Sequence, residues 1–447
     1  MPEFSCILIG NESLAMHCGD NLLARGHDIR AIVTRMPEIK TWAEGKGIPV
    51  TSPGPDLATR LGPVECDWVL SIANLSLVPD DVLAMAGKGA VNFHDGPLPQ
   101  YAGLNVPVWA ILNGETQHGV TWHLIDGDVD EGAIIDQRLF DIAEDETALT
   151  LNAKCFAAGI EGFEAVMDQL ETGTPEGQAQ DLSQRRLFAR ADRPAAAGRL
   201  DFTQNAEGLL RLIRGLDHST YWNPLTSPKI AVDTHILRVS DAEPAEAAGD
   251  AAPGTVLAVS EAGVTVATGT TPILLQKITD LAGHPVPSEI LPKPGDMLAS
   301  LDPAAAETLT AAMARVVPAE GHWRRILNTA SPAAIPDLHD GPSDTPDNRV
   351  ITNDLSQDRL ITAFYSLISR LDDTADLAIA LQDSSAPSAP GILSTWVPLS
   401  VSVSADTQFG DLHSALSKEI AYARTYPAFA LDVVARDPQM TAPVVPD

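Results

Sequence analysis

The sequence of 447 residues predicts an α/β protein: a parallel sheet with crossover helices, then a small β-barrel, then a further small α/β unit. Two observations predict this class. Through about the first third of the chain, short apolar runs alternate with stretches of helical spacing, which is the pattern of a parallel sheet. From Pro253 onward, short apolar runs alternate with turns, which is typical of a small barrel. At roughly 100–200 residues per domain, the length also predicts several domains.

The first part of the chain carries six expected strands and four expected helices. The strands are expected at residues 5–10, 29–34, 67–73, 89–93, 119–124 and 133–139. The helices are expected at residues 13–25, 38–46, 79–86 and 147–171. Ligands of such sheets bind at the carboxyl ends of the strands. The turn at residues 10–13 lacks the GxGxxG pattern, so we expect no dinucleotide there.

The rest of the chain contains two expected linkers. Residues 172–199 are rich in Gly, Pro and Ala and are expected to wrap the surface, followed by a helix at 205–216. Residues 328–350 form the second expected linker. After it we expect a helix at 357–371, strands at 375–381 and 395–403, and a helix at 407–424.

The charge balance argues against a nucleic-acid partner. Lys and Arg total 29 and Asp and Glu total 60, which gives a formal net charge of −31. Such a chain repels polyphosphate unless a basic face is segregated. The largest basic cluster is small, and we expect it to be a solvated face of the first linker. It consists of Arg185, Arg186, Arg190 and Arg193.

Cysteine usage and hydropathy indicate a reducing compartment. The four cysteines lack CxxC spacing, so we expect buried or free thiols and neither a disulfide framework nor a metal site. They are Cys6, Cys18, Cys66 and Cys155. No apolar run is long enough to cross a membrane, and the first ten residues lack a secretory n-region. We therefore expect a cytoplasmic protein with no membrane partner.

The densest polar cluster begins in the fourth expected strand and leaves its carboxyl end. Asn92 and His94 are two residues apart, so their side chains share one face of an extended chain. An amide can donate to an oxyanion, and an imidazole can move a proton. Taken alone, the pair is more simply explained as a turn asparagine and a histidine bonded to nearby backbone.

A second cluster lies in the acidic loop at residues 126–132. Asp126, Asp128, Asp130 and Glu131 occur there with two glycines, but the twelfth-position Glu and flanking helices of a calcium loop are missing. We expect no metal. A solvated acidic turn is the plain explanation. A functional carboxylate in this loop would orient an imidazole and raise its basicity.

Taken together, the two clusters resemble the folate-dependent formyltransferase family, the family of the methionyl-tRNA formyltransferases. The resemblance lies in the order and spacing of Asn92-x-His94, Leu98-Pro99-x-x-x-Gly103, Trp109-x-Ile111-x-x-Gly114, Gly119-Val120-Thr121 and Asp130-x-Gly132. It implies a catalytic constellation of Asn92, His94 and Asp130. The chain departs from the family where the usual Ser-Leu-Leu-Pro is Gly-Pro-Leu-Pro at residues 96–99.

The resemblance also implies the two substrates. The donor would be N10-formyltetrahydrofolate and the acceptor a primary amine, with no metal. The pterin contacts of the family are largely backbone groups. They fall on Leu75, Ser76, Leu77, Val129 and Gly103. The apolar side chains near residue 75 suit a flat ring, although ordinary core packing explains them equally well.

Three stretches place the chain within the family. Residues 9–14 with Trp42-Ala43 are similar to the formylation domains of nonribosomal peptide synthetases. Residues 214–225 and 253–256 are similar to the segment that leads into the family's C-terminal barrel and to the start of that barrel. The resemblance thus implies a Rossmann-like catalytic domain at 1–190 and a linker with an OB-like subdomain at 191–317.

The tail, residues 318–447, resembles part of a peptide-synthetase condensation domain at residues 322–327 and 359–427. The catalytic HHxxxDG is absent, and only His339 precedes Asp340-Gly341. The implication is a separate, non-catalytic remnant; an unrelated α/β interaction domain is the alternative. Cutting near residue 320 is then expected to leave transfer to a small amine intact.

The implied acceptor is an aminoacyl amine of nonribosomal peptide or related natural-product biosynthesis, bound to a carrier protein or otherwise activated, and the implied partners are other assembly-line domains. Four alternatives stay open: an amino sugar, methionyl-tRNA, hydrolysis of the donor, and an inactive docking module. The sequence leaves the acceptor, the oligomeric state and the natural C-terminus undetermined.

Overall fold

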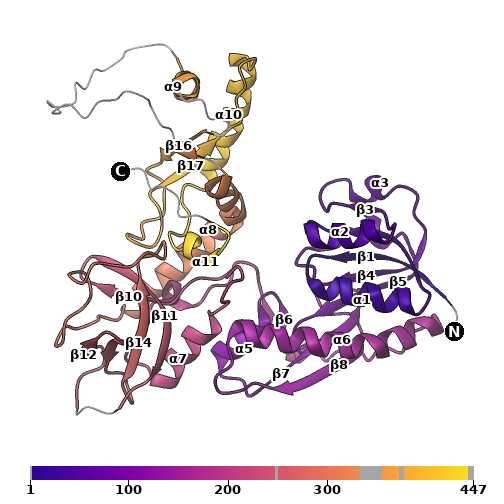
Figure 1. Cartoon of the computed structure of the whole chain (residues 1–447), viewed down its shortest axis with the longest axis horizontal. Helices are drawn as coiled ribbons and strands as arrows, with labels where there is room; N and C mark the ends of the chain where they lie inside the picture. Colours follow the sequence, from indigo (N-terminus) through magenta and orange to yellow (C-terminus); the bar gives the residue numbers. More distant parts are fainter. Residues whose placement is uncertain (1–2, 247–249, 330, 333–354, 372–376, 441–447) are drawn as a thin grey trace. The chain divides into compact units, whose positions relative to one another are not determined.

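The computed structural model describes residues 3–246, 250–329, 331–332, 355–371 and 377–440 (Figure 1). The chain divides into two compact units. Unit 1 is Met1–Arg190, and unit 2 is Ala191–Asp447. Residues 333–350 of the linker expected at 328–350, including the His339-Asp340-Gly341 sequence, lie outside the described residues, and residues 328–329 belong to a helix.

Unit 1 is built on a seven-stranded sheet in the order β3-β2-β1-β4-β5-β7-β8 (Figure 1). The strands are β1 (Ser5–Gly10), β2 (Asp28–Val33), β3 (Val50–Thr51), β4 (Cys66–Ile72), β5 (Ala86–His94), β7 (Gln117–Leu124) and β8 (Ile134–Asp141). The first five strands in this order are parallel, as predicted. The last two are antiparallel to their neighbours, so the sheet is mixed.

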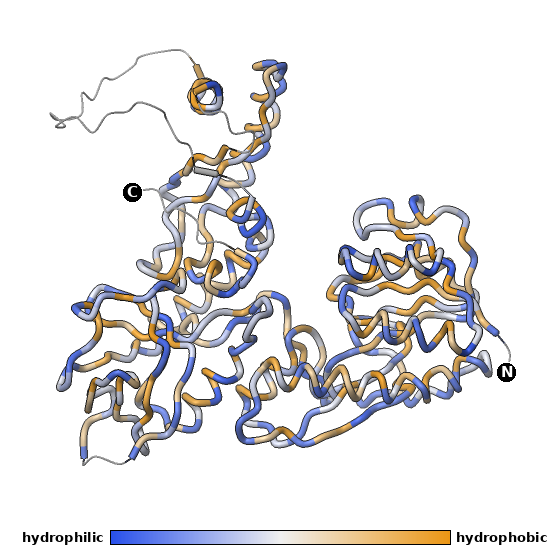
Figure 2. Tube along the Cα trace, viewed as in Figure 1, coloured by the Kyte–Doolittle hydropathy of each residue, from blue (hydrophilic) through white to orange (hydrophobic). Residues whose placement is uncertain are grey.

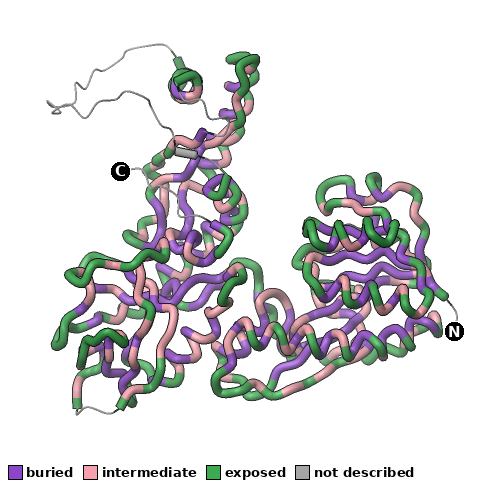
Figure 3. Tube along the Cα trace, in the orientation of Figure 1, coloured by how far each residue is buried: buried purple, intermediate pink, exposed green. Residues whose placement is uncertain are grey.

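Both faces of this sheet are covered. In β1, Cys6 and Leu8 face one apolar cluster, while Ile7 and Ile9 face another. The first cluster includes side chains of α1, α2 and α6, and the second includes side chains of α3 and α4. A parallel sheet buried on both faces requires continuous apolar strands, and Figures 2 and 3 show these strands as hydrophobic and buried. The helices are α1 (Ser13–Ala24), α2 (Pro37–Gly45), α3 (Leu57–Leu61), α4 (Asp80–Leu83), α5 (Val106–Asn113) and α6 (Ala148–Thr172).

Successive side chains of β5 point to opposite faces of the sheet, and this determines where its polar side chains lie. Val91 and Phe93 belong to the cluster beneath α6, so Asn92 and His94 lie on the opposite face. In β7, Val120 and Trp122 belong to that same cluster, which places Thr121 and His123 beside Asn92 and His94.

The segment after α6 differs from the expected surface linker. It contains a short 3₁₀ helix, η1 (Leu182–Gln184), and a strand, β9 (Leu187–Phe188), that pairs with β6 (Ala102–Gly103). Phe188 is buried, and it stacks on Tyr101 and Trp109. The residues before 190 are therefore part of the packed structure of unit 1.

Unit 2 contains a five-stranded antiparallel sheet in the order β10-β11-β14-β13-β12. The elements are η2 (Ala195–Gly198), α7 (Ala206–Gly215), β10 (Lys229–Val232), β11 (His235–Pro244), β12 (Val256–Ser260), β13 (Gly263–Val266) and β14 (Ile273–Thr279). The strand region thus begins at Lys229, earlier than the expected Pro253. Helix α7 has the predicted position and packs its buried leucines into the core of this sheet.

The tail of unit 2 is an α/β structure in which the expected elements are present. They are α9 (Gln357–Leu371), β16 (Leu377–Gln382), β17 (Trp396–Ser400) and α10 (Phe409–Thr425), joined by β15 (Ser331–Pro332) and α11 (Val433–Arg436). A 27-residue helix, α8 (Pro303–Thr329), precedes them. The boundary expected between residues 317 and 318 lies inside this helix.

A buried ionic network joins the tail to the start of unit 2. Lys229 is fully buried, and its Nζ donates to Asp432 Oδ2 at 2.6 Å. Arg436 donates to Asp432 Oδ1 at 2.9 Å and also pairs with Glu320. Residues 318–447 are therefore bonded to the barrel region within one compact unit. The tail, expected as a separate unit, thus shares unit 2 with the five-stranded sheet and supplies the counter-ion of Lys229.

Candidate active site

The polar cluster on β5 is completed by a residue of β7. Asn92 lies directly opposite His123 in the antiparallel pair, and Asn92 Nδ2 is 3.2 Å from His123 Nε2. His123 Nδ1 is 2.8 Å from the carbonyl of Leu124, so Nδ1 carries a proton. When Nε2 is unprotonated it accepts from the Asn92 amide, and when it carries a proton it can donate to Asp130 Oδ1, which lies 3.5 Å away. The second amide proton of Asn92 stays available for another acceptor.

His94 is held so that one ring nitrogen faces the acidic loop. Its Nε2 lies 2.6 Å from the carbonyl of Tyr101 and therefore donates. Its Nδ1 lies 3.7 Å from Asp130 Oδ2. Because Nε2 is bonded to backbone, Nδ1 is the nitrogen that can exchange a proton with a substrate.

Asp130 reaches the cluster from the loop between β7 and β8. Its backbone has the left-handed φ of 59°, which is uncommon outside glycine. Its Oδ2 accepts the N–H of Gly103 at 2.9 Å, and its Oδ1 lies 3.5 Å from His123 Nε2. Burial alone would raise the pKa of Asp130, but His94, His123 and the Gly103 N–H outweigh burial and hold this pKa well below its usual value. The carboxylate thus stays ionised at neutral pH.

The structure therefore brings the three predicted catalytic residues together. Asp130 lies beside both His94 and His123, and His123 connects it to Asn92. Sequence reasoning missed His123. The alternation of side chains along β7 could have indicated it. Residues 121 and 123 share one face of the strand, so a strand that places Thr121 beside His94 also places His123 on that face.

The loop that follows His94 is fixed by hydrogen bonds from β7 and β8. Thr121 Oγ1 donates to the carbonyl of Gly96 at 2.8 Å and accepts the N–H of Leu98 at 3.2 Å. Gln137 Nε2 donates to the carbonyl of Leu98 at 2.9 Å. Residues 96–99, where the sequence departs from that of the family, are therefore fixed by hydrogen bonds beside the cluster.

Four of the predicted donor-binding residues lie in two loops, whereas the fifth, Gly103, lies in β6 and is part-buried. Leu75 and Leu77 are 67% and 79% exposed, and Val129 is 40% exposed. They are therefore not core residues, which removes the plain explanation for their apolar character. The Asn74 side chain bonds both the N–H and the carbonyl of Ser76.

Two arginines of the 182–190 segment hold these loops. Arg185 donates to the carbonyl of Val129 at 2.7 Å, and Arg190 donates to the carbonyl of Leu75 at 3.0 Å. Arg186 stacks over Phe188 at 4.8 Å from the ring centroid. The expectation of a solvated basic face holds for Arg186 and Arg190, which are exposed, but not for Arg185, which is part-buried, or for Arg193, which is buried.

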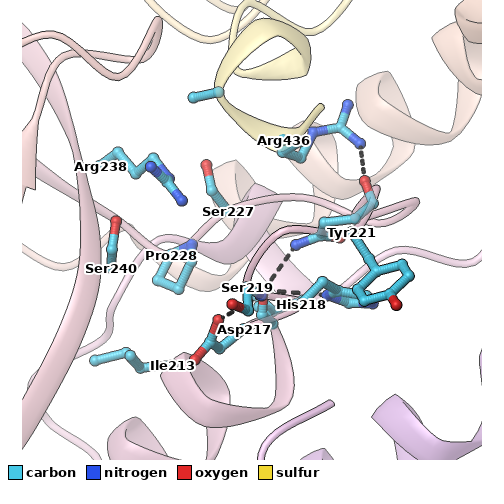
Figure 4. A pocket seen from close by; sticks show the side chains of 13 residues that line it. Ile213, Asp217, His218, Ser219, Tyr221, Ser227, Pro228, Arg238, Ser240 and Arg436 are labelled. Carbon is cyan, nitrogen blue, oxygen red and sulfur yellow. Dashed lines mark hydrogen bonds between the residues drawn. The ribbon is translucent and has the colours of Figure 1, made fainter. Parts of the chain in front are cut away.

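A recess in unit 2 contains none of the predicted catalytic residues (Figure 4). It is lined by residues of α7, of the loop between α7 and β10, of β11 and of α11, among them His218, Arg238 and Arg436. Burial lowers the pKa of His218. The guanidinium of Arg436 is engaged by Asn223, Asp432 and Glu320. This recess is distinct from the cluster on β5 and β7.

The part of the chain that the structure describes has neither a metal-binding cluster nor a membrane-spanning helix. No cluster of three or more His, Cys, Asp or Glu side chains there could hold a metal ion. No helix among the described residues is long and apolar enough to cross a membrane. The four cysteines are buried free thiols, as the sequence predicted.

Two family models match the chain and together cover more than half of it. The model described as formyl transferase matches residues 34–167, and the model described as formyl transferase, C-terminal domain, matches residues 194–291. The first range contains Asn92, His94, His123 and Asp130. The chain belongs to the folate-dependent formyltransferase family. It is an N-formyltransferase, and its two matched regions lie in unit 1 and unit 2.

Curated relatives of this formyltransferase include two methionyl-tRNA formyltransferases. The protein from Geobacter metallireducens is 26% identical over 297 residues, which is 62% of this chain and 91% of that protein. The protein from Anaeromyxobacter dehalogenans is 29% identical over 302 residues, which is 63% of this chain and 94% of that protein. Both matches leave about a third of the chain uncovered.

Solved structures similar to the formyltransferase include an N-formyltransferase from Helicobacter canadensis in complex with folinic acid and dTDP-3-aminofucose. It is 19% identical with a TM-score of 0.49, and the match covers 62% of this chain and 99% of that chain. HypX from Aquifex aeolicus in complex with tetrahydrofolic acid is 19% identical with a TM-score of 0.45, covering 61% of this chain and 43% of that chain.

Proposed function

We propose that the protein transfers the formyl group of N10-formyltetrahydrofolate to the primary amine of an aminoacyl group held by a carrier protein in nonribosomal peptide assembly. The reaction rests on one observation, the convergence of Asn92, His94 and Asp130 through His123. The acceptor rests on the resemblance of residues 9–14 to peptide-synthetase formylation domains and on the net charge of −31.

The donor would bind beside the two loops held by Arg185 and Arg190. The exposed Leu75, Leu77 and Val129 side chains suit the faces of a flat ring. The carbonyls of Leu75 and Val129 already accept arginine hydrogen bonds, but each oxygen retains a second lone pair. The folate supplies an activated formyl group; the remaining chemistry belongs to the side chains.

In this mechanism the free N–H of Asn92 donates to the oxyanion that develops on the formyl oxygen. One such donor contributes about 3–4 kcal/mol of barrier lowering. His94 Nδ1 takes a proton from the attacking amine and returns one to the leaving nitrogen, which is worth about 10²–10⁴-fold. Asp130 keeps the imidazole oriented and stabilises its protonated form.

The variants Asn92→Ala, His94→Ala and Asp130→Ala are each expected to lower formyl transfer by about 10²-fold or more. The matched control is His17→Ala, because His17 is exposed on α1 of the same unit. Donor affinity, measured by calorimetry, and the unfolding midpoint should show that each variant is folded. Near-normal turnover in His94→Ala would refute the assignment.

Methionyl-tRNA is the second candidate acceptor, because the two curated relatives carry that name over nearly their full lengths. Binding tRNA depends on phosphate neutralisation, which an acidic chain opposes. Incubation with the donor and aminoacyl carrier proteins, free amines, amino-sugar nucleotides or charged initiator tRNA, followed by mass analysis, separates these acceptors. Sub-micromolar binding of initiator tRNA at physiological salt would overturn the carrier proposal.

The same assay distinguishes two further hypotheses for the function. A donor hydrolase would release tetrahydrofolate at full rate without any amine. An inactive docking module would bind the donor and yield no product with any acceptor. The proposal requires that tetrahydrofolate release depend on the added amine.

A further inference from the structure

A second carboxylate, that of Asp95, lies beside the proton-exchanging nitrogen of His94. Asp95 Oδ1 is 3.9 Å from His94 Nδ1, and Asp130 Oδ2 is 3.7 Å from the same atom. The nitrogen that meets the acceptor is therefore flanked by two carboxylates. The mechanism above gives Asp130 a role and leaves Asp95 without one.

Other residues fix the backbone of Asp95, and its carboxylate accepts a hydrogen bond from its own backbone N–H. The Asp95 carbonyl accepts from His118 Nε2 at 2.8 Å and from Cys155 Sγ at 3.8 Å. No hydrogen bond from another side chain reaches its carboxylate within the described residues, and the Asp95 side chain is 29% exposed. A partly buried carboxylate is costly without a cationic partner, and this one lies where a substrate must approach.

The charges around His94 Nδ1 favour the binding of a cation there. Burial raises the pKa of Asp95; His94 opposes this rise, and the charge of Asp130 adds to it. The two carboxylates repel each other across His94 Nδ1, and a positive charge placed there would relieve the repulsion. Primary amines are cationic at neutral pH, so the acceptor itself brings that charge.

We propose that Asp95 is the counter-ion that binds the ammonium form of the acceptor amine and places it against His94 Nδ1. This assignment rests on the proposed function. The ammonium first loses one proton to His94 and from there to solvent. The neutral nitrogen then forms the bond to the formyl carbon, the bond from that carbon to N10 breaks, and the second proton passes through His94 to N10. One proton is released for each formamide formed.

The test compares charged and uncharged acceptors of nearly the same shape. Ethylamine is protonated at neutral pH, and trifluoroethylamine is not. Asp95→Asn should lower kcat/KM for ethylamine by about 10–100-fold, the range expected for losing a hydrogen bond to a charged group. For trifluoroethylamine it should change kcat/KM less than about threefold. Asp95→Glu should recover part of the ethylamine rate.

A second measurement does not depend on turnover. Ethyltrimethylammonium is permanently cationic and cannot be formylated, so its inhibition constant should rise about tenfold or more in Asp95→Asn. The matched control is Asp145→Asn, which removes an exposed carboxylate of the same unit. Donor affinity should be unchanged in both variants.

The outcomes separate the two proposals. Equal losses for both amines, or an unchanged inhibition constant, would overturn the role of Asp95 and leave the proposed function standing. If the wild-type protein binds the donor but transfers the formyl group to none of the acceptors, both the proposed function and the role of Asp95 are overturned.

Discussion

Replacing Asp432 by asparagine removes the only carboxylate within reach of the fully buried Lys229 ammonium in the part of the chain that the structure describes. Asp432 Oδ2 also accepts the Ser227 N–H and hydroxyl, each at 2.9 Å, and Oδ1 accepts from Arg436. Lys229 would keep only neutral acceptors, the nearest being the Ser227 carbonyl at 2.7 Å. Breaking one partner of a buried pair typically costs 3–5 kcal/mol, so we expect unit 2 to lose about that much stability.

The matched control is Asp358→Asn, which breaks the partly exposed pair with Arg424 at 2.7 Å. Such a pair contributes less than about 1 kcal/mol. Native-state hydrogen exchange of the amides at residues 226–232 and 432–437, in increasing urea, reports unit 2 alone. A loss in Asp432→Asn no larger than that of the control would refute the reasoning.

The pH dependence gives an independent check. Burial alone would raise the pKa of Asp432, but Lys229 and Arg436 outweigh it and hold the pKa far below its usual value. A carboxylate with a depressed folded pKa stabilises the fold above its unfolded pKa of about 4 and loses this contribution as the pH falls further. The difference between wild type and Asp432→Asn should therefore narrow below about pH 4. A chain cut near residue 320 lacks Asp432 altogether and should lose the fold of unit 2.

Three further predictions concern unit 1. In Gly103→Ala the new Cβ would clash with the Phe188 carbonyl, and residue 103 has a φ of 98°. Urea unfolding should therefore show a loss of about 1–3 kcal/mol in the free energy of unfolding. The control Gly45→Ala, at a helical position with open space around it, should show no such loss. His123→Ala should lower kcat about tenfold or more with donor affinity unchanged, because the link from Asn92 to Asp130 is lost; a change in donor affinity alone would contradict this. Burial lowers the pKa of His118 from 6.5 to about 4. As the pH is lowered between these values, His118 binds a proton in the unfolded chain but not in the folded protein, so the free energy of unfolding falls by about 3 kcal/mol. His118→Asn should flatten that slope in unfolding measured from pH 7 to 4, and an unchanged slope would contradict the assignment.

The sequence alone determined the elements whose residues carry a strong local period. β1, β4 and α6 lie within a residue or two of their predicted bounds, because apolar runs and helical spacing depend on neighbours along the chain. The shared face of Asn92 and His94 followed from the period of a strand in the same way. α8 also carried a local signal, since Asp302 caps its first turn and Pro303 begins it.

Only the tertiary structure decided which distant residues meet. Nothing local to Asn92 indicates that His123 lies opposite it, because that contact depends on the register of an antiparallel pair. The hydrogen bonds from the Gly103 N–H to Asp130 and from Arg185 to the Val129 carbonyl likewise join segments far apart in sequence. The tail looked separable because its elements are locally complete. Its attachment depends on Lys229 and Asp432, two ordinary charged residues in the sequence, which become an obligate pair only when folding removes both from water.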